Sequence, residues 1–336
     1  MKIQLKPVRE QVIVITGATS GIGLATAKAA AKRGALLVLN ARAEADLQTV
    51  ATEISELGGQ VAYAAGDIAD EAVVRQLGDT AIAEFGRIDT WVNNAGVSIY
   101  GLLEEVSIDD ARRLFDTNYW GMVQGSLIAL QHLKTNGGAL INVGSELSET
   151  VIPLQGHYTA SKHALKGFTE TLRIELEKAE APVSVTLVEP SAIDTPYPEH
   201  AKNYMDVEPT HQPPVYAPEI VANAILHCAA HPHRTVRIGA GAKAFTLIEK
   251  IVPALGDRIK VATAFEGSRT DEPARNGDTL YGPRPGDPRV RGKYKGHVMK
   301  QSWSTAATLR PIPAMLAAAT IGVGLAYAVR SLRKQS

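Results

Sequence analysis

A glycine-rich turn between a short apolar run and a helical pattern limits the possible folds more than any other feature of this chain. The run is Val12–Ile15, and the turn is Thr16-Gly17-Ala18-Thr19-Ser20-Gly21-Ile22-Gly23. A helix-periodic stretch begins near Ile22. Glycine lets the backbone turn tightly and approach a ligand, and a helix N-terminus offers free N–H groups. This strand, turn and helix therefore predict a site for an anionic group such as a pyrophosphate.

The alternation of strand and helix continues along the chain. Further buried strands are predicted at Leu36–Leu39, Val61–Ala64, Thr90–Val92, Leu140–Val143, Val183–Val188 and Arg234–Ile238. Helical patterns cover residues 22–33, 44–57, 70–85, 107–134, 157–180 and 218–230. This order predicts an α/β fold, in which helices cover both faces of a doubly wound parallel sheet.

The composition excludes several classes of function. Lysine plus arginine and aspartate plus glutamate each number 35, so no net charge favours nucleic acid as a partner. The single cysteine, Cys228, excludes an internal disulfide, and no His/Cys/Asp cluster has the spacing of a metal site. The N-terminus lacks the basic and then apolar pattern of a secretory signal. We expect no metal and no nucleic-acid partner.

The C-terminal part differs in composition from the rest. From Gly267 to His297, glycines and prolines recur among charges, a mixture that cannot bury enough apolar surface to order itself alone. This segment is expected to be a linker or an irregular strap laid over the body. We therefore predict a catalytic domain over residues 1–265, a tether over 266–309 and an apolar tail helix over 310–336.

The tail contains a charge-free stretch from Pro311 to Val329. A helix of about twenty apolar residues crosses a bilayer, so a membrane anchor is favoured, with the catalytic domain in the cytoplasm. The alternative is an alanine-rich helix packed on the body or on a second subunit of a soluble cytoplasmic protein.

Three side chains predict proton transfer to a carbonyl oxygen. Tyr158 and Lys162 lie four residues apart on one helix face, and Ser145 follows the strand Leu140–Val143. The free phenol has a pKa near ~10, which a nearby ammonium lowers by stabilising the phenolate. Ser145 would donate a hydrogen bond to the substrate oxygen as charge develops there.

Together these motifs resemble the short-chain dehydrogenase/reductase family in its single-domain form, with a Rossmann fold. Asp67-Ile68, Asn93-Asn94-Ala95-Gly96 and Pro190…Thr195 follow the third, fourth and sixth strands, as in that family. The resemblance implies that Asp67 meets the adenine, that Asn94–Gly96 line the adenine-ribose side and that Thr195 meets the carboxamide. It also implies that Asn118 holds its helix open and carries a water toward Lys162.

The family often has Pro-Gly where this chain has Pro190-Ser191, so the loop path is expected to differ slightly. The implied catalytic residues are Asn118, Ser145, Tyr158 and Lys162. The expected cofactor-binding residues are Thr16, Gly17, Thr19, Ser20, Gly21, Ile22, Gly23, Arg42, Asp67, Ile68, Asn94, Ala95, Gly96, Tyr158, Lys162, Pro190, Ile193 and Thr195. By resemblance, a homodimer or homotetramer would pair through the helices at 107–134 and 157–180.

Cofactor choice depends on the end of the second strand. An acidic residue there would bind a ribose 2′-hydroxyl and repel a 2′-phosphate. This chain has Asn40-Ala41-Arg42 instead, and a guanidinium matches phosphate geometry. NADP(H) is therefore predicted over NAD(H).

The leading hypothesis is an NADP(H)-dependent oxidoreductase that interconverts a carbonyl and a secondary alcohol on a lipophilic small molecule. The alternatives are a 3-oxoacyl-thioester reductase of lipid metabolism and a non-catalytic dinucleotide-binding scaffold. Two groups of nearby residues receive no catalytic role. Glu146, Glu149, His157 and His163 are expected to be structural, whereas Tyr197, Tyr204 and Met205 fall in a segment expected to be a substrate lid.

Overall fold

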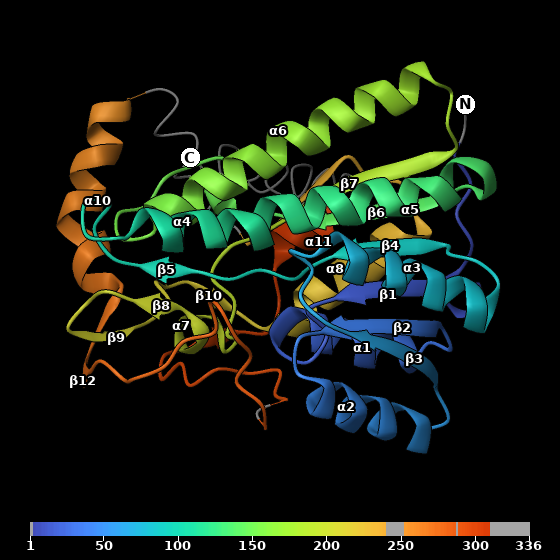
Figure 1. Ribbon diagram of the computed structural model, residues 1–336. Helices are drawn as coiled ribbons and strands as arrows, with labels where there is room; N and C mark the ends of the chain where they lie inside the picture. The colour runs from blue at the N-terminus through green and yellow to red at the C-terminus, as the bar shows by residue number, and fades with distance from the viewer. Residues whose placement is uncertain (1–2, 240–251, 287, 310–336) are drawn as a thin grey trace, which may run out of the picture.

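The computed structural model describes residues 3–239, 252–286 and 288–309, and its centre is a seven-stranded parallel sheet (Figure 1). The strands are β1 (Val12–Thr16), β2 (Leu36–Ala41), β3 (Gln60–Ala65), β4 (Thr90–Asn93), β6 (Gly138–Val143), β7 (Val183–Pro190) and β11 (Thr235–Ile238). Their order is β11-β7-β6-β4-β1-β2-β3. The order reverses between β1 and β4, so the sheet is doubly wound as predicted.

Helices cover both faces of this sheet. One face carries α1 (Gly21–Ala31), α2 (Glu44–Glu56) and α8 (Pro218–Ala230), and the other carries α3 (Glu71–Phe85), α5 (Met122–Asn136) and α6 (Gly156–Lys178). Successive side chains of a strand point to opposite faces. Ile13 and Ile15 of β1 therefore belong to the first core, whereas Val12 and Val14 belong to the second.

The long helix expected over residues 107–134 is interrupted. The structure has α4 (Ile108–Phe115), a π-helical turn at Asp116–Gly121, and then α5. A π turn holds one extra residue and often marks a functional site. Asn118 lies in this turn, and its side-chain amide pairs with the backbone of Val97. A long-range contact of this kind leaves no periodic signal in the sequence.

Several short elements form one end of the molecule, around α7 (Tyr197–His200) and α10 (Pro253–Gly267), and none of them was predicted (Figure 1). The strand pairs are β5 (Ile99–Tyr100) with β8 (Lys202–Asn203), β9 (Val207–Pro209) with β12 (Arg269–Pro273), and β10 (Val215–Tyr216) with β13 (Val298–Met299). The last helix described is α11 (Trp303–Leu309). Because β12 and β13 pair with strands of the body, the segment after residue 266 lies against it.

The proposed anchor at Pro311–Val329 lies outside the described residues. Within the ranges that the structure describes, no helix combines the length and the apolar character needed to span a bilayer. The division of the chain at residues 265 and 309 stays a prediction.

A buried hydrogen-bond network connects the central strands to the helices behind them. The Trp91 indole donates to Asn93 Oδ1 at 2.8 Å, and Asn93 Nδ2 donates to Asn142 Oδ1 at 2.9 Å. Asn93 Nδ2 also reaches Ser126 Oγ, and Asn142 Nδ2 donates to Thr169 Oγ1 at 2.9 Å. Removing one member leaves buried partners unsatisfied, and this is costly in a low-dielectric interior.

We predict that Asn93→Ala lowers the free energy of unfolding by about 2–4 kcal/mol, because it orphans the Trp91 N–H and removes the closest donor to Asn142 Oδ1. Urea denaturation followed by fluorescence measures the loss. The control is Asn223→Ala on the exposed side of α8, which should cost no more than about 1 kcal/mol. Equal losses in the two variants would show that the network adds nothing to stability.

Candidate active site

Hydrogen bonds between side chains and the backbone hold the glycine-rich turn against the end of β4. Thr16 Oγ1 accepts hydrogen bonds from the N–H groups of Asn94 at 3.0 Å and Ala95 at 3.1 Å. In return, Asn94 Nδ2 donates to the carbonyls of Thr16 and Gly17 at 3.0 and 3.2 Å. A Cβ at Gly17 would lie 2.8 Å from the Ala95 Cα, so only glycine fits here. The ends of β1 and β4 thereby form one rigid floor.

Two cavities meet above this floor. One, of about 220 Å³, lies over the ends of β1, β2 and β3. The other, of about 260 Å³, lies over the ends of β4, β6 and β7. Ile22, Asn94, Gly96, Thr195 and Tyr197 line both. The cleft thus sits at the reversal of strand order, where open α/β sheets bind ligands. We call the two halves the nucleotide cavity and the substrate cavity.

The nucleotide cavity contains most of the expected cofactor residues. Its walls include Gly17, Thr19, Ser20, Gly21, Ile22, Arg42, Asp67, Ile68, Asn94, Ala95 and Gly96. Thr16 and Gly23 support the turn from behind, since a Cβ at Gly23 would lie 2.0 Å from the Gly17 carbonyl oxygen. Pro190 and Ile193 line the substrate cavity instead. The glycine-rich backbone turn at the start of α1 fits a dinucleotide pyrophosphate.

Two polar side chains of this cavity already have partners within the chain. Asp67, expected at the adenine, forms an ion pair with Arg113. Arg42 donates to the carbonyl oxygens of Thr279 at 2.6 Å and Leu280 at 3.4 Å, a contact that the sequence did not predict. Burial lowers the pKa of Arg42, and the charge of Asp67 partly offsets this. No described carboxylate forms an ion pair with Arg42.

Tyr158 and Lys162 meet in the substrate cavity, both nearly buried on α6. The Lys162 ammonium lies 5.5 Å from the centre of the Tyr158 ring and donates to the Val143 carbonyl at 3.0 Å. Burial raises the pKa of Tyr158 to about 12, although hydrogen bonds from Ser145 and Tyr197 lower it. Burial lowers the pKa of Lys162 to about 8. The phenol is therefore in its acid form at neutral pH.

Ser145 is placed to donate a hydrogen bond. It caps the short 3-10 turn Glu146–Ser148 after β6, and its Oγ accepts the Leu147 N–H at 3.1 Å. The Ser145 hydroxyl also hydrogen-bonds with Tyr158, so the two hydroxyl groups lie side by side and a ligand oxygen could meet both. Ser145, Tyr158 and Lys162 all line the same cavity.

Asn118 lies behind the site. Its Oδ1 accepts the Val97 N–H at 2.8 Å and its Nδ2 donates to the Val97 carbonyl at 2.9 Å. Between Asn118 and Lys162 lies Gly96, where a Cβ would sit 3.4 Å from Asn118 Oδ1 and 3.9 Å from Lys162 Nζ. Asn118 thus holds the chain segment beside the ammonium. The expected water relay to Lys162 stays a prediction.

Sequence reasoning missed several residues of the substrate cavity. The Tyr197 hydroxyl lies 2.7 Å from Ser98 Oγ and 2.8 Å from Gln155 Oε1, and its ring packs edge-on against Tyr158 at 5.4 Å. Lys260 enters from α10. The place of Tyr197 in the expected lid segment partly indicated that it lies near the site, because lids close over the reacting groups. No sequence feature indicated that α10 reaches the site.

Glu149 and Glu146, both set aside as structural, lie in different places. Glu149 binds Lys166 and Arg237 at 2.8 and 2.7 Å, away from the phenol. Glu146 instead lines the substrate cavity, where burial raises its pKa to about 7. Its place on the wall was not foreseen, because a residue next to Ser145 can face either way.

The match to known proteins agrees with this geometry. A profile described as short chain dehydrogenase matches residues 11–205, which include the glycine-rich turn, Ser145, Tyr158 and Lys162. This chain belongs to the short-chain dehydrogenase family. It is therefore an oxidoreductase that acts on CH–OH and C=O groups with a nicotinamide dinucleotide, as the motifs predicted.

Related family members extend the match. An uncharacterized oxidoreductase, YxnA, from Bacillus subtilis (strain 168) is 45% identical over 316 residues, which cover 93% of this chain and 88% of the relative. An 11-beta-hydroxysteroid dehydrogenase A from Sesamum indicum is 40% identical over 187 residues, or 55% of this chain and 53% of the relative.

Two solved structures share the fold. An alcohol dehydrogenase from Thermococcus sibiricus, complexed with 5-hydroxy-NADP, has a TM-score of 0.60 at 27% identity over 68% of this chain and 95% of that one. A short chain dehydrogenase/reductase from Burkholderia phymatum, in complex with NAD, has a TM-score of 0.68 at 24% identity over 82% of this chain and 100% of that one. The second likeness shows the fold alone.

We predict that kcat/KM for ketone reduction is flat near neutral pH and falls above about pH 8, where Lys162 loses its charge. Tyr158, with a pKa of about 12, stays protonated over this range. Lys162→Arg should move the fall to higher pH, because a guanidinium stays charged. Lys166→Met, on the same helix but outside the cavity, should keep the wild-type profile. A profile without an alkaline fall would contradict this role of Lys162.

Proposed function

We propose that the protein prefers NADP(H) to NAD(H) and interconverts a ketone or aldehyde and its alcohol on an apolar substrate. Arg42 carries the cofactor preference. Its guanidinium lines the nucleotide cavity beside the end of β2, where Asn40 is bound to the carbonyls of Ala64 and Gly66. A cation at this place favours a 2′-phosphate over a bare ribose hydroxyl.

The substrate oxygen would lie between Ser145 and Tyr158. The bound nicotinamide supplies or accepts the hydride at the carbon. Ser145 donates a hydrogen bond to the oxygen as negative charge develops, and Tyr158 transfers the phenolic proton to it. The Lys162 ammonium stabilises the phenolate that remains. Thr195 would hold the carboxamide, since it lines both cavities at their junction.

An apolar substrate is supported by the cavity wall. The residues that line the substrate cavity include the largely apolar side chains Tyr100, Leu147, Val151, Ile152, Pro213, Pro214 and Ala264. Polar side chains, among them Glu146, Gln155 and Lys260, interrupt this wall and could orient a polar substituent. The match to hydroxysteroid dehydrogenases over about half of this chain supports the same substrate class.

Pairing with a second copy is also part of this proposal. Four large apolar side chains are half exposed or more on the helices expected to pair: Ile108 at 61%, Trp120 at 51%, Leu127 at 51% and Ile174 at 60%. Burial in a helix–helix interface would remove them from water.

Membrane attachment through the tail stays a prediction, and so does the alternative that the protein is a 3-oxoacyl-thioester reductase. The scaffold alternative is disfavoured, because the three reacting side chains line one cavity beside the nucleotide cavity.

We predict that Arg42→Ala raises the Kd for NADPH by roughly ten- to a hundredfold and the Kd for NADH by far less, because a charge-assisted contact to phosphate is lost. Fluorescence titration of the purified protein measures both constants. Arg75→Ala, on the exposed side of α3, removes the same charge and should change neither. An equal loss for both nucleotides would remove Arg42 as the basis of the cofactor preference.

A further inference from the structure

A segment of the C-terminal extension crosses the nucleotide cavity. We call residues 277–286 and 288–293 the strap; in Figure 1 it belongs to the orange and red chain that continues from β12. The Thr279 N–H donates to the His200 carbonyl at 2.9 Å, and the Gly286 N–H donates to Asp46 Oδ1 at 2.8 Å. The strap is therefore bound to α7 on one side of the cavity and to α2 on the other.

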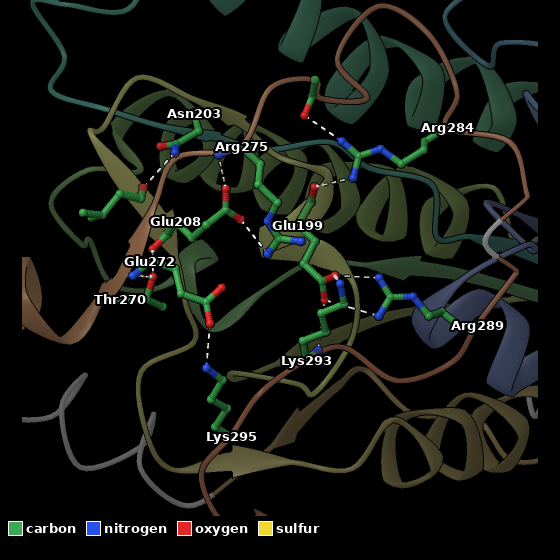
Figure 2. Close-up of polar contacts among 12 residues, drawn as sticks. Glu199, Asn203, Glu208, Thr270, Glu272, Arg275, Arg284, Arg289, Lys293 and Lys295 are labelled. Atoms are coloured by element: carbon green, nitrogen blue, oxygen red, sulfur yellow. Dashed lines mark hydrogen bonds and ion pairs between the residues drawn. The ribbon is translucent and has the colours of Figure 1, made fainter.

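A buried carboxylate on α7, Glu199, fixes the far part of the strap. Glu199 has a side chain only 8% exposed and accepts Arg289 Nη2 at 2.6 Å and the Lys293 N–H at 2.9 Å (Figure 2). Arg291 forms a further ion pair with Asp194 at 3.2 Å. Asp194 directly precedes Thr195, which lines both cavities. Breaking a buried ion pair leaves an uncompensated charge, so the strap stays docked.

The strap brings a second guanidinium to the nucleotide cavity. Arg284 lines this cavity together with Arg42, Thr279 and Pro283. Its nitrogens donate to the backbone carbonyls of Gly277 at 2.7 Å and Glu199 at 3.3 Å (Figure 2). Over the described ranges no carboxylate forms an ion pair with it. Arg284 and Arg42 are thus two cations held by neutral carbonyl oxygens only.

The carboxylates of this cavity have other partners. Asp67 pairs with Arg113, and Asp46 accepts the Gly286 N–H. The charges of Arg42 and Arg284 therefore have no matching anion in hydrogen-bonding contact. A phosphate oxygen accepts a hydrogen bond about twice as strongly as a neutral carbonyl. A dianionic phosphate would therefore replace the carbonyls of Thr279 and Gly277 as the partner of the two side chains.

We propose that Arg284 of the strap acts with Arg42 to bind the 2′-phosphate of NADP(H), so that the C-terminal extension is part of the nucleotide site. This rests on the proposed cofactor preference. The strap also supplies the Arg289 carbonyl to the Gly21 N–H at 3.0 Å, at the first turn of α1. A pyrophosphate would take over that donor, and the ion pairs to Glu199 and Asp194 would keep the strap in place.

Fluorescence titration with NADPH and with NADH tests the proposal. Arg284→Gln should raise the Kd for NADPH by about tenfold or more and the Kd for NADH by about twofold or less, because only NADPH carries the 2′-phosphate. Arg284→Lys keeps the positive charge but loses the planar guanidinium that binds phosphate through two hydrogen bonds. Its Kd for NADPH should lie between those of the wild type and Arg284→Gln. The matched control is Arg275→Gln, in the same extension but paired with Glu208 outside the cavity. It should leave the ratio of the two constants unchanged.

Hydrogen exchange of the nucleotide-free variants shows separately whether the strap has loosened. A loose strap would weaken NADPH and NADH alike, so the ratio of their Kd values isolates the phosphate contact. Wild-type preference for NADPH that survives in Arg284→Gln would overturn this proposal and leave the role of Arg42 intact. A wild-type protein that binds both nucleotides equally would overturn the proposed cofactor preference and this proposal together.

Discussion

The close contact between the glycine-rich turn and the end of β4 determines where the chemistry takes place. Four hydrogen bonds join Thr16 and Gly17 to Asn94 and Ala95, across the point where the strand order reverses. A side chain at Gly17 would push the two backbones apart. Because the two cavities share this floor, a cofactor over β1 and a substrate over β6 would meet at the residues that line both cavities. The positions of the strand ends in the sheet therefore determine how the reacting groups face each other.

Burial then gives the reacting groups their proton affinities. Tyr158 and Lys162 lie on one face of α6, both with little exposure to water, so desolvation favours the neutral form of each. The neutral form of Tyr158 is the acid needed to protonate an alkoxide. The lowered pKa of Lys162 places the loss of its charge near pH 8. Asn118 supports this arrangement by binding the backbone of Val97, next to Gly96 and the Lys162 ammonium.

The sequence was most informative where local patterns determine structure. Strands such as β1 and β2 were predicted to within two residues, because short continuous apolar runs are typical of buried parallel strands. The interrupted helix at Asp116–Gly121, the helix α10 and the strap were missed or left open, because long-range contacts define them. The ion pair between Glu199 and Arg289 joins residues 90 positions apart, and no short motif encodes it. Short sequence motifs could therefore suggest the candidate site residues of the body, whereas no motif pointed to those on the extension.

The most direct test of the account is a panel of apolar ketones and aldehydes, assayed with NADPH at the nicotinamide absorbance, for the wild-type protein and Tyr158→Phe. The account predicts turnover by the wild type and none by the variant, together with unchanged NADPH binding, because only the transferable proton has been removed. Turnover retained by Tyr158→Phe would contradict the central claim that this phenol is the acid of a carbonyl reductase.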